Sequence, residues 1–173
     1  MGKSTINLII LFFVLVICQA VICNNICLFN VATPIIFIYL IVRLPLTFNI
    51  NIVLSISFLL GLIIDIFSDT YGMHALSCTI LSFIRKYILR LYIPREEEIA
   101  DGEVSIKSVG FLPYFKFLLT IVLIYCFLIF SIEAFSFFNI TRVLSQISFS
   151  TIFSFVIILG IDRITNKQRE KKL

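Results

Sequence analysis

The chain has 173 residues, of which 60% are hydrophobic and 14% charged, and its net charge is +4. This composition is far more apolar than that of soluble globular domains, so it excludes a soluble enzyme and predicts an integral membrane protein. Because a membrane-spanning helix needs about 20 residues, the chain has room for about six spans and for no soluble domain of useful size.

The first two apolar segments differ in quality. Residues 6–23 form a long apolar run that only Gln19 interrupts, and we expect an uncleaved helix rather than a signal peptide, because no small-residue cleavage pattern precedes a soluble domain. Residues 26–44 form a weaker segment that contains Pro34. A kink or break is predicted there, because proline removes a backbone hydrogen bond and clashes with the preceding turn.

Four further apolar segments complete a predicted all-α bundle of six transmembrane helices in a single membrane domain, 1–173. They cover residues 50–67, 72–92, 112–130 and 143–161. A hydrophilic loop at 93–111 and a basic tail at 163–173 are the longest polar pieces.

Positive charges are distributed unevenly over the connections between these segments. With both termini in the cytoplasm, 13 of the 14 Lys and Arg residues lie on the cytoplasmic side, and only Arg142 lies outside. This is the positive-inside pattern, and it supports an even number of spans. The same assignment places Asp65, Asp69 and Glu133 at the outer face.

Two charged stretches lie on the predicted cytoplasmic side. The basic stretch RKYILRLYIPR is typical of a juxtamembrane segment that contacts anionic lipid head groups and anchors the topology; its basic residues are Arg85, Lys86, Arg90 and Arg95. The loop sequence EEEIADGE carries five acids and is expected to be a solvated loop or a docking strip for a cytoplasmic protein. The short basic tail predicts membrane orientation rather than nucleic-acid binding.

The segment GLIIDIFSDTYGMHA, residues 61–75, combines carboxylates, glycines and the single histidine at a membrane boundary. If the third helix continues to Asp69, then Gly61, Asp65 and Asp69 share one helical face. A break before the fourth helix is the other interpretation, with Asp69 or Thr70 as its N-cap and Gly72 relieving the turn. Asp65 should point into the bundle, because an intramembrane carboxylate needs a partner. The candidates are His74, Arg142 and backbone donors at the start of the fourth span.

Catalytic and metal-binding patterns are not recognisable in the sequence. His74 has no second histidine at a metal-ligand spacing, no nucleophile accompanies the carboxylates, and the five cysteines show no paired spacing. We therefore expect a non-enzyme without a cofactor, in which the cysteines are small apolar fillers.

The polar residues around the third and fourth segments resemble those of the MreD family, the rod shape-determining membrane proteins of bacterial cell-wall elongation. The matching positions are Gly61, Asp65, Ser68, Gly72, His74 and Ala75. Residues 85–95 and the sequence EAFSF at 133–137 are also similar to some members. The second segment departs from the pattern because it is weakly apolar.

The resemblance implies a non-catalytic scaffold with a fold similar to the substrate-binding S components of energy-coupling-factor transporters. Its implied partners are MreC, the RodA glycan polymerase with its penicillin-binding transpeptidase, and indirectly MreB. A partner's single helix is expected to pack on the third and fourth segments, where Gly61, Ser55, Ser57 and Ser77 allow close contact. The alternative is a vitamin-type uptake component that binds its substrate in the outer half, with a site drawn from Asn24, Asn25, Asp65, Asp69, His74, Glu133 and Asn139.

Overall fold

The computed structural model describes residues 2–21, 34–93, 104, 109–133 and 140–170. All regular secondary structure in these residues is helical, which confirms the all-α class. The helices are α1 (Gly2–Val21), α2 (Ile38–Arg43), α3 (Ile50–Ser68), α4 (Met73–Tyr92), α6 (Phe111–Glu133) and α7 (Ile140–Glu170). The predicted basic tail is thus helical up to Glu170.

Within the described residues, three helices are long and apolar enough to cross a membrane, which indicates a membrane protein. They are α3, α6 and residues 143–165 of α7, and α1 contains a shorter apolar stretch at Leu8–Val21. Helix α4 has 20 residues, but three basic residues lie in its second half: Arg85, Lys86 and Arg90.

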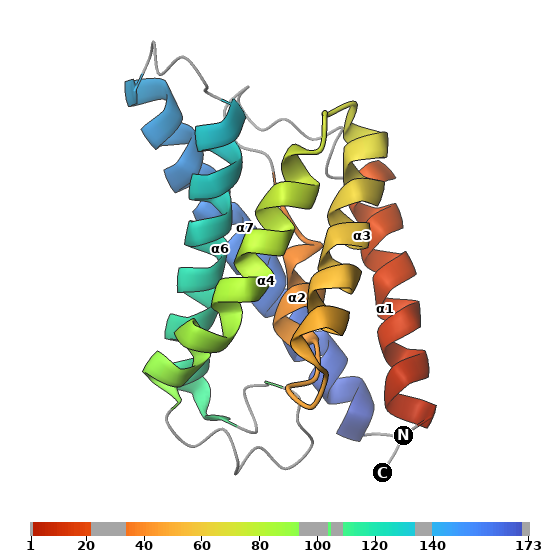
Figure 1. Ribbon diagram of the computed structural model, residues 1–173. Helices are drawn as coiled ribbons and strands as arrows, with labels where there is room; N and C mark the ends of the chain where they lie inside the picture. Colours follow the sequence, from red (N-terminus) through yellow and green to blue (C-terminus); the bar gives the residue numbers. More distant parts are fainter. Residues whose placement is uncertain (1, 22–33, 94–103, 105–108, 134–139, 171–173) are drawn as a thin grey trace.

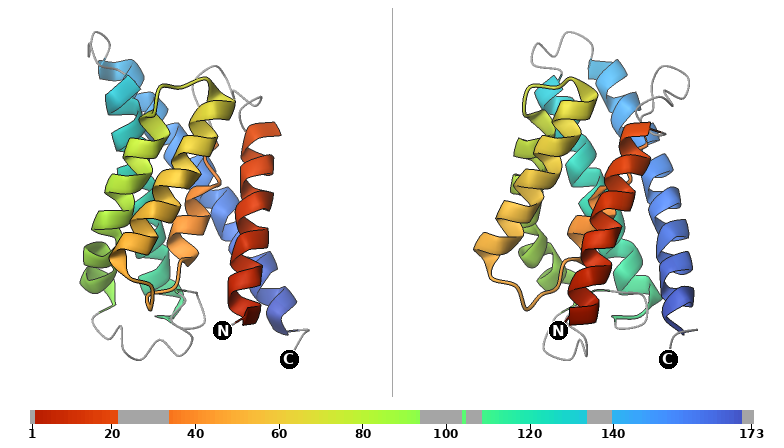
Figure 2. Two further views of the ribbon diagram at one scale, coloured as in Figure 1. Left: turned by 45° about the vertical axis from the view of Figure 1, so that its right-hand side comes forward. Right: turned by 90° about the vertical axis from the view of Figure 1, so that its right-hand side faces the viewer.

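The long helices run up and down the bundle, and α3, α4, α6 and α7 pack against one another in chain order. Helix α1 packs on α3, and α2 lies in the interior, where it contacts α1, α4 and α6 (Figures 1 and 2). The start of α1, the end of α4, the start of α6 and the end of α7 lie at one end of the bundle (Figure 1). We call this the basic end, because Arg85, Lys86, Arg90, Lys116 and Arg163 belong to these helix termini. The opposite end, where α3 and α6 finish with Asp65 and Glu133, is the acidic end.

The second apolar segment is interrupted, as predicted, near Pro34. Residues 34–37 are not helical, and α2 has only six residues, so the described part of 26–44 is broken rather than kinked. Residues 26–33 lie outside the described part. Every residue from Pro34 to Leu44 is buried, so this non-helical backbone lies inside the protein. Backbone that is not helical is tolerated at membrane depth only where its polar groups find partners.

Side chains from two other helices provide those partners. The Gln19 side chain in α1 donates to the carbonyl of Pro34 over 3.1 Å and accepts from the N–H of Ile36 over 2.9 Å. The N–H of Ile35 donates to Ser154 Oγ of α7 over 2.8 Å. Gln19, the one polar residue that interrupts the first apolar run, therefore pairs backbone groups that the break in the second segment leaves without helical partners.

The C-terminal end of α2 is satisfied by Arg85 of α4. Its Nη2 donates to the carbonyl of Val42 over 3.0 Å and also to the carbonyl of Leu44, just before Pro45 ends the segment. Arg85 is only 3% exposed. The prediction that Arg85 is a lipid anchor is thus wrong, because its guanidinium is directed into the bundle to bind carbonyls that no helix pairs.

A buried ion pair fixes α2 to the end of α7. The Arg43 Nε lies 3.9 Å from Asp162 Oδ1, and Tyr39 connects the two. Tyr39 Oη donates to Asp162 over 2.9 Å and accepts from Arg43 Nε over 2.9 Å. Both charges are almost fully enclosed, so each depends on the other for compensation.

Helices α3 and α4 are packed at backbone contact through Gly61. A Cβ at this position would lie 2.5 Å from Ala75 Cα and 2.6 Å from the carbonyl oxygen of His74. Further along the same contact, Ser82 donates to Ser57. Gly61, Ser57 and Ser77 are therefore enclosed within the bundle, and the expectation that they face a partner's helix is wrong; Ser55 is exposed.

Replacement of Gly61 by alanine should destabilise the fold by about 1–3 kcal/mol, because backbone cannot yield to the added methyl group. Gly160→Ala in α7 is the matched control, since nothing lies within 4 Å of its Cβ. Chemical unfolding in detergent measures both. Equal stability of the two variants would contradict the close α3–α4 contact.

Asp162→Leu should cost about 3–5 kcal/mol, because it leaves the Arg43 charge buried without its carboxylate. Combined with Arg43→Met, it should recover much of this loss. Arg163→Ala, an exposed charge one residue away, should change stability by less than about 0.5 kcal/mol. Chemical unfolding in detergent measures all these variants. If the loss of stability in the double variant equals the sum of the two single losses, the pair is not coupled.

Candidate functional site

The connection between α3 and α4 turns the chain with two residues in the left-handed region. Asp69 ends α3 at a φ of 57°, and Gly72 precedes α4 at a φ of 76°. Gly72 thus relieves the turn, as predicted. Asp69 and Thr70 are not the N-cap of α4, so that prediction is wrong: the N-cap position is Gly72, which has no side chain to donate or accept. We call residues 61–75 the α3–α4 joint.

Asp65 caps α4 from the last turns of α3. Its two carboxylate oxygens accept from the N–H groups of His74, over 3.0 Å, and Ala75, over 2.8 Å. The Thr70 hydroxyl donates to it over 2.6 Å. Because the first N–H groups of a helix lack partners and carry partial positive charge, a carboxylate is favoured here. Asp65 is 5% exposed, which confirms that it faces the bundle and is held by backbone donors.

The His74 ring reaches α6. Its Nδ1 lies 2.6 Å from the hydroxyl of Tyr125, and the two rings are nearly parallel with centroids 6.3 Å apart. Phe37, in the break before α2, meets both rings edge to face. His74 therefore connects α4 to α6 and to the interrupted segment at the acidic end.

The other predicted site residues do not join this cluster. Ser68 is the last residue of α3, and Asp69 and Glu133 are exposed at the acidic end. Lys86 and Arg90 are exposed at the basic end, whereas Arg95, Asn24, Asn25, Asn139 and the side chain of Arg142 lie outside the described part. Cys78 and Cys126 are buried, as expected of apolar fillers.

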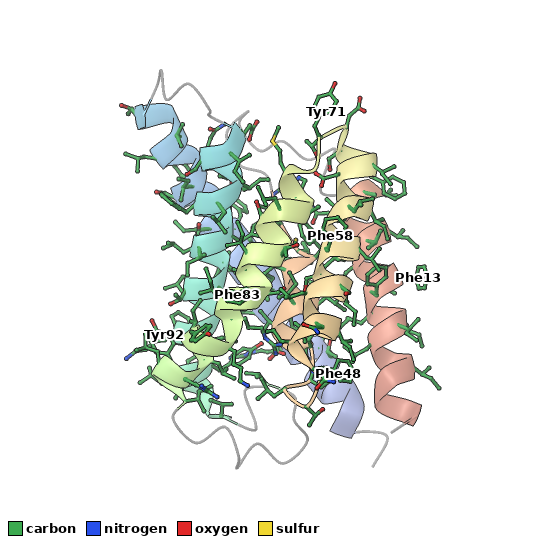
Figure 3. All side chains as sticks on the ribbon, in the orientation of Figure 1. Phe13, Phe48, Phe58, Tyr71, Phe83 and Tyr92 are labelled. Carbon is green, nitrogen blue, oxygen red and sulfur yellow. The ribbon has the colours of Figure 1, made fainter. Side chains whose placement is uncertain are left out.

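An open groove of about 670 Å³ runs along the outside of α3 and α4 next to the joint. Phe58, Leu62 and Ile66 of α3 form one wall, and Leu76 and Thr79 of α4 form the other. Figure 3 shows Phe58 along α3 and Tyr71 at the turn of the acidic end, where its side chain is 98% exposed. Asp65, Asp69 and Gly72 line the groove near the turn. The groove is thus apolar along its length and acidic at one end.

The polar residues of this region cap α4, and the groove beside them presents an apolar surface. The carboxylate of Asp65 and the ring of His74 already have protein partners. Within the described ranges, no group of three or more His, Cys, Asp or Glu side chains could hold a metal ion.

Sequence reasoning missed Tyr125 and the Asp162 pair. Tyr125 lies inside an uninterrupted apolar run. The only sign of a buried partner was its hydroxyl group, because a buried tyrosine hydroxyl usually forms a hydrogen bond. Asp162 follows directly on the last apolar run, on the predicted cytoplasmic side. A carboxylate at the end of an apolar run was the signal that could have identified it.

Asp65→Asn should lower stability by about 1–3 kcal/mol, because an amide offers one acceptor oxygen where two N–H groups and a hydroxyl converge. Asp69→Asn is the matched control: its side chain is exposed, and asparagine also tolerates the left-handed conformation. Thermal unfolding in detergent should separate the two variants. A cap role for Asp65 is contradicted if both are as stable as the parent.

Comparison with known proteins leaves the family open. No protein-family model, no curated protein and no solved structure matches this chain. The features that bear on function are therefore the α3–α4 joint and the groove beside it.

Proposed function

We propose that this chain is a non-catalytic, multi-pass component of the bacterial inner membrane that maintains rod shape by assembling the cell-wall elongation machinery. In this proposal six segments cross the membrane with both termini in the cytoplasm, so that the acidic end faces outward. The partners are MreC and a RodA-type glycan polymerase with its penicillin-binding transpeptidase, and MreB is reached indirectly.

The observation that carries the proposal is the α3–α4 joint. Most residues on which the MreD resemblance rests touch one another there: Gly61 contacts the backbone at Ala75, and Asp65 accepts from His74 and Ala75. Residues spread over 15 positions of the sequence thus form one structural unit that joins α3 to α4. Such a unit is a better basis for a family resemblance than a similar number of unconnected apolar matches.

The groove beside the joint is the best candidate for the surface that binds a partner. Helices in lipid associate through close packing and polar contacts rather than through the hydrophobic effect. A hollow of about 670 Å³ between α3 and α4 offers a single transmembrane helix more packing contact than a convex helix surface. The partner-facing residues proposed are therefore Phe58, Leu62, Ile66 and Leu76, in place of the enclosed Ser57 and Ser77.

The uptake component receives less support from the same geometry. Two of the side chains that would bind a substrate, Asp65 and His74, are engaged within the protein. Asp69 and Glu133 are exposed on different helices. A substrate would have to displace the cap of α4 in order to be bound by Asp65.

Filling the groove tests the proposal. Leu76→Trp should reduce the recovery of MreC-type and synthase partners in affinity purification from the host by about tenfold, equivalent to about 1.4 kcal/mol of lost association. Leu123→Trp, at an equally exposed leucine on α6, is the control and should leave recovery unchanged.

Depletion of the protein in a rod-shaped host gives the second measurement. Cells should become round, the Leu123→Trp protein should restore rods, and the Leu76→Trp protein should not. Rods that persist under complete depletion would overturn the proposed function. Normal partner recovery with Leu76→Trp would remove the groove as the binding surface.

A further inference from the structure

A second, smaller pocket lies at the basic end, on the opposite end of the α3–α4 pair from the joint. It has a volume of about 50 Å³. One side is formed by the turn between α2 and α3 and by the start of α3, with Pro45, Leu46, Phe48 and Val53. Figure 3 shows Phe48 at this turn, where α2 ends and α3 begins. The pocket is therefore located where the predicted cytoplasmic boundary of the membrane would be.

The other side of the pocket is cationic. Ser82, Arg85 and Lys86 of α4 line it, and no acidic residue of the described part does. Arg85 is 3% exposed and is held by the carbonyls of Val42 and Leu44, whereas the Lys86 side chain is exposed. Two adjacent positive charges thus meet an apolar wall.

Among the described residues, the charges of neighbouring elements do not neutralise this pair. At the basic end, the buried carboxylate of Asp162 is engaged by Tyr39 and Arg43. The exposed basic residues around it, Lys116 of α6 and Arg163 of α7, add positive charge to the same end. The electrostatic potential at the pocket is therefore positive among the described residues, which favours an anion.

We propose that this pocket binds the phosphate group of an anionic phospholipid, with Lys86 as the direct ligand and the buried charge of Arg85 behind it. The volume is suited to a small group such as a phosphate rather than to a peptide. The apolar residues on the turn side suit the first carbons of the acyl chains.

The phosphate would also act on the fold through Arg85. That residue satisfies the last carbonyls of α2, so an anion beside it favours the buried guanidinium in the position that binds them. Lipid binding at the basic end is thereby coupled to the interrupted segment. A lipid bound only at the surface by long-range attraction would not have this effect.

Native mass spectrometry and thermal unfolding of the purified full chain test the proposal, with phosphatidylglycerol and phosphatidylcholine as probes. The parent protein should retain phosphatidylglycerol preferentially and be stabilised by it. Lys86→Ala should weaken this binding by about fivefold, the loss expected for one lysine near an anionic lipid surface. Lys116→Ala removes an exposed charge at the same end and should leave the preference intact.

Three outcomes would overturn the proposal. The first is equal phosphatidylglycerol binding by the parent and the Lys86→Ala variant. The second is an equal loss with Lys116→Ala, which would show that only the overall charge of the basic end matters. The third is stabilisation by inorganic phosphate as strong as that by phosphatidylglycerol, which would assign the pocket to free phosphate instead of lipid.

Discussion

The structure depends on one constraint: backbone polar groups inside a membrane must find partners within the protein. The long helices meet this constraint by themselves, but residues 34–44 cannot, because the break at 34–37 and the short α2 leave carbonyl and N–H groups without helical partners. Gln19, Ser154 and Arg85 supply what is missing. These three side chains come from α1, α7 and α4, so the broken segment binds together helices that are distant in the chain.

The same constraint explains how far the sequence could predict the fold. The bounds of α3 and α4 agree with the prediction within one residue, because turn residues and apolar runs mark helix ends locally. The break near Pro34 was predicted for the same reason. The role of Gln19 could not be predicted, since its partners are 15 and 17 residues away in another segment. Arg85 was predicted to be a lipid anchor because it belongs to a basic cluster in the sequence. In the structure its guanidinium instead binds buried carbonyl groups.

The candidate site divides in a similar way. That Asp65 turns inward and binds backbone donors followed from the cost of an unpaired intramembrane carboxylate. Which residue occupies the N-cap position, and that the His74 ring is bound by Tyr125, followed from packing between helices. Some residues of the α3–α4 joint hold α4 in place, whereas Leu62 and Ile66 form part of a wall of the groove beside it, and Asp65, Asp69 and Gly72 line its acidic end. The position of the groove thus depends on the hydrogen bonds inside the joint.

The dependence of α2 on α7 has a consequence for biogenesis. The N–H of Ile35 pairs with Ser154, 119 positions later, and Tyr39 pairs with Asp162, 123 positions later. These native pairs of the early segment can therefore form only after the final helix has been synthesised. A chain truncated before α7 would lack the acceptors of the Ile35 N–H and of the Tyr39 hydroxyl.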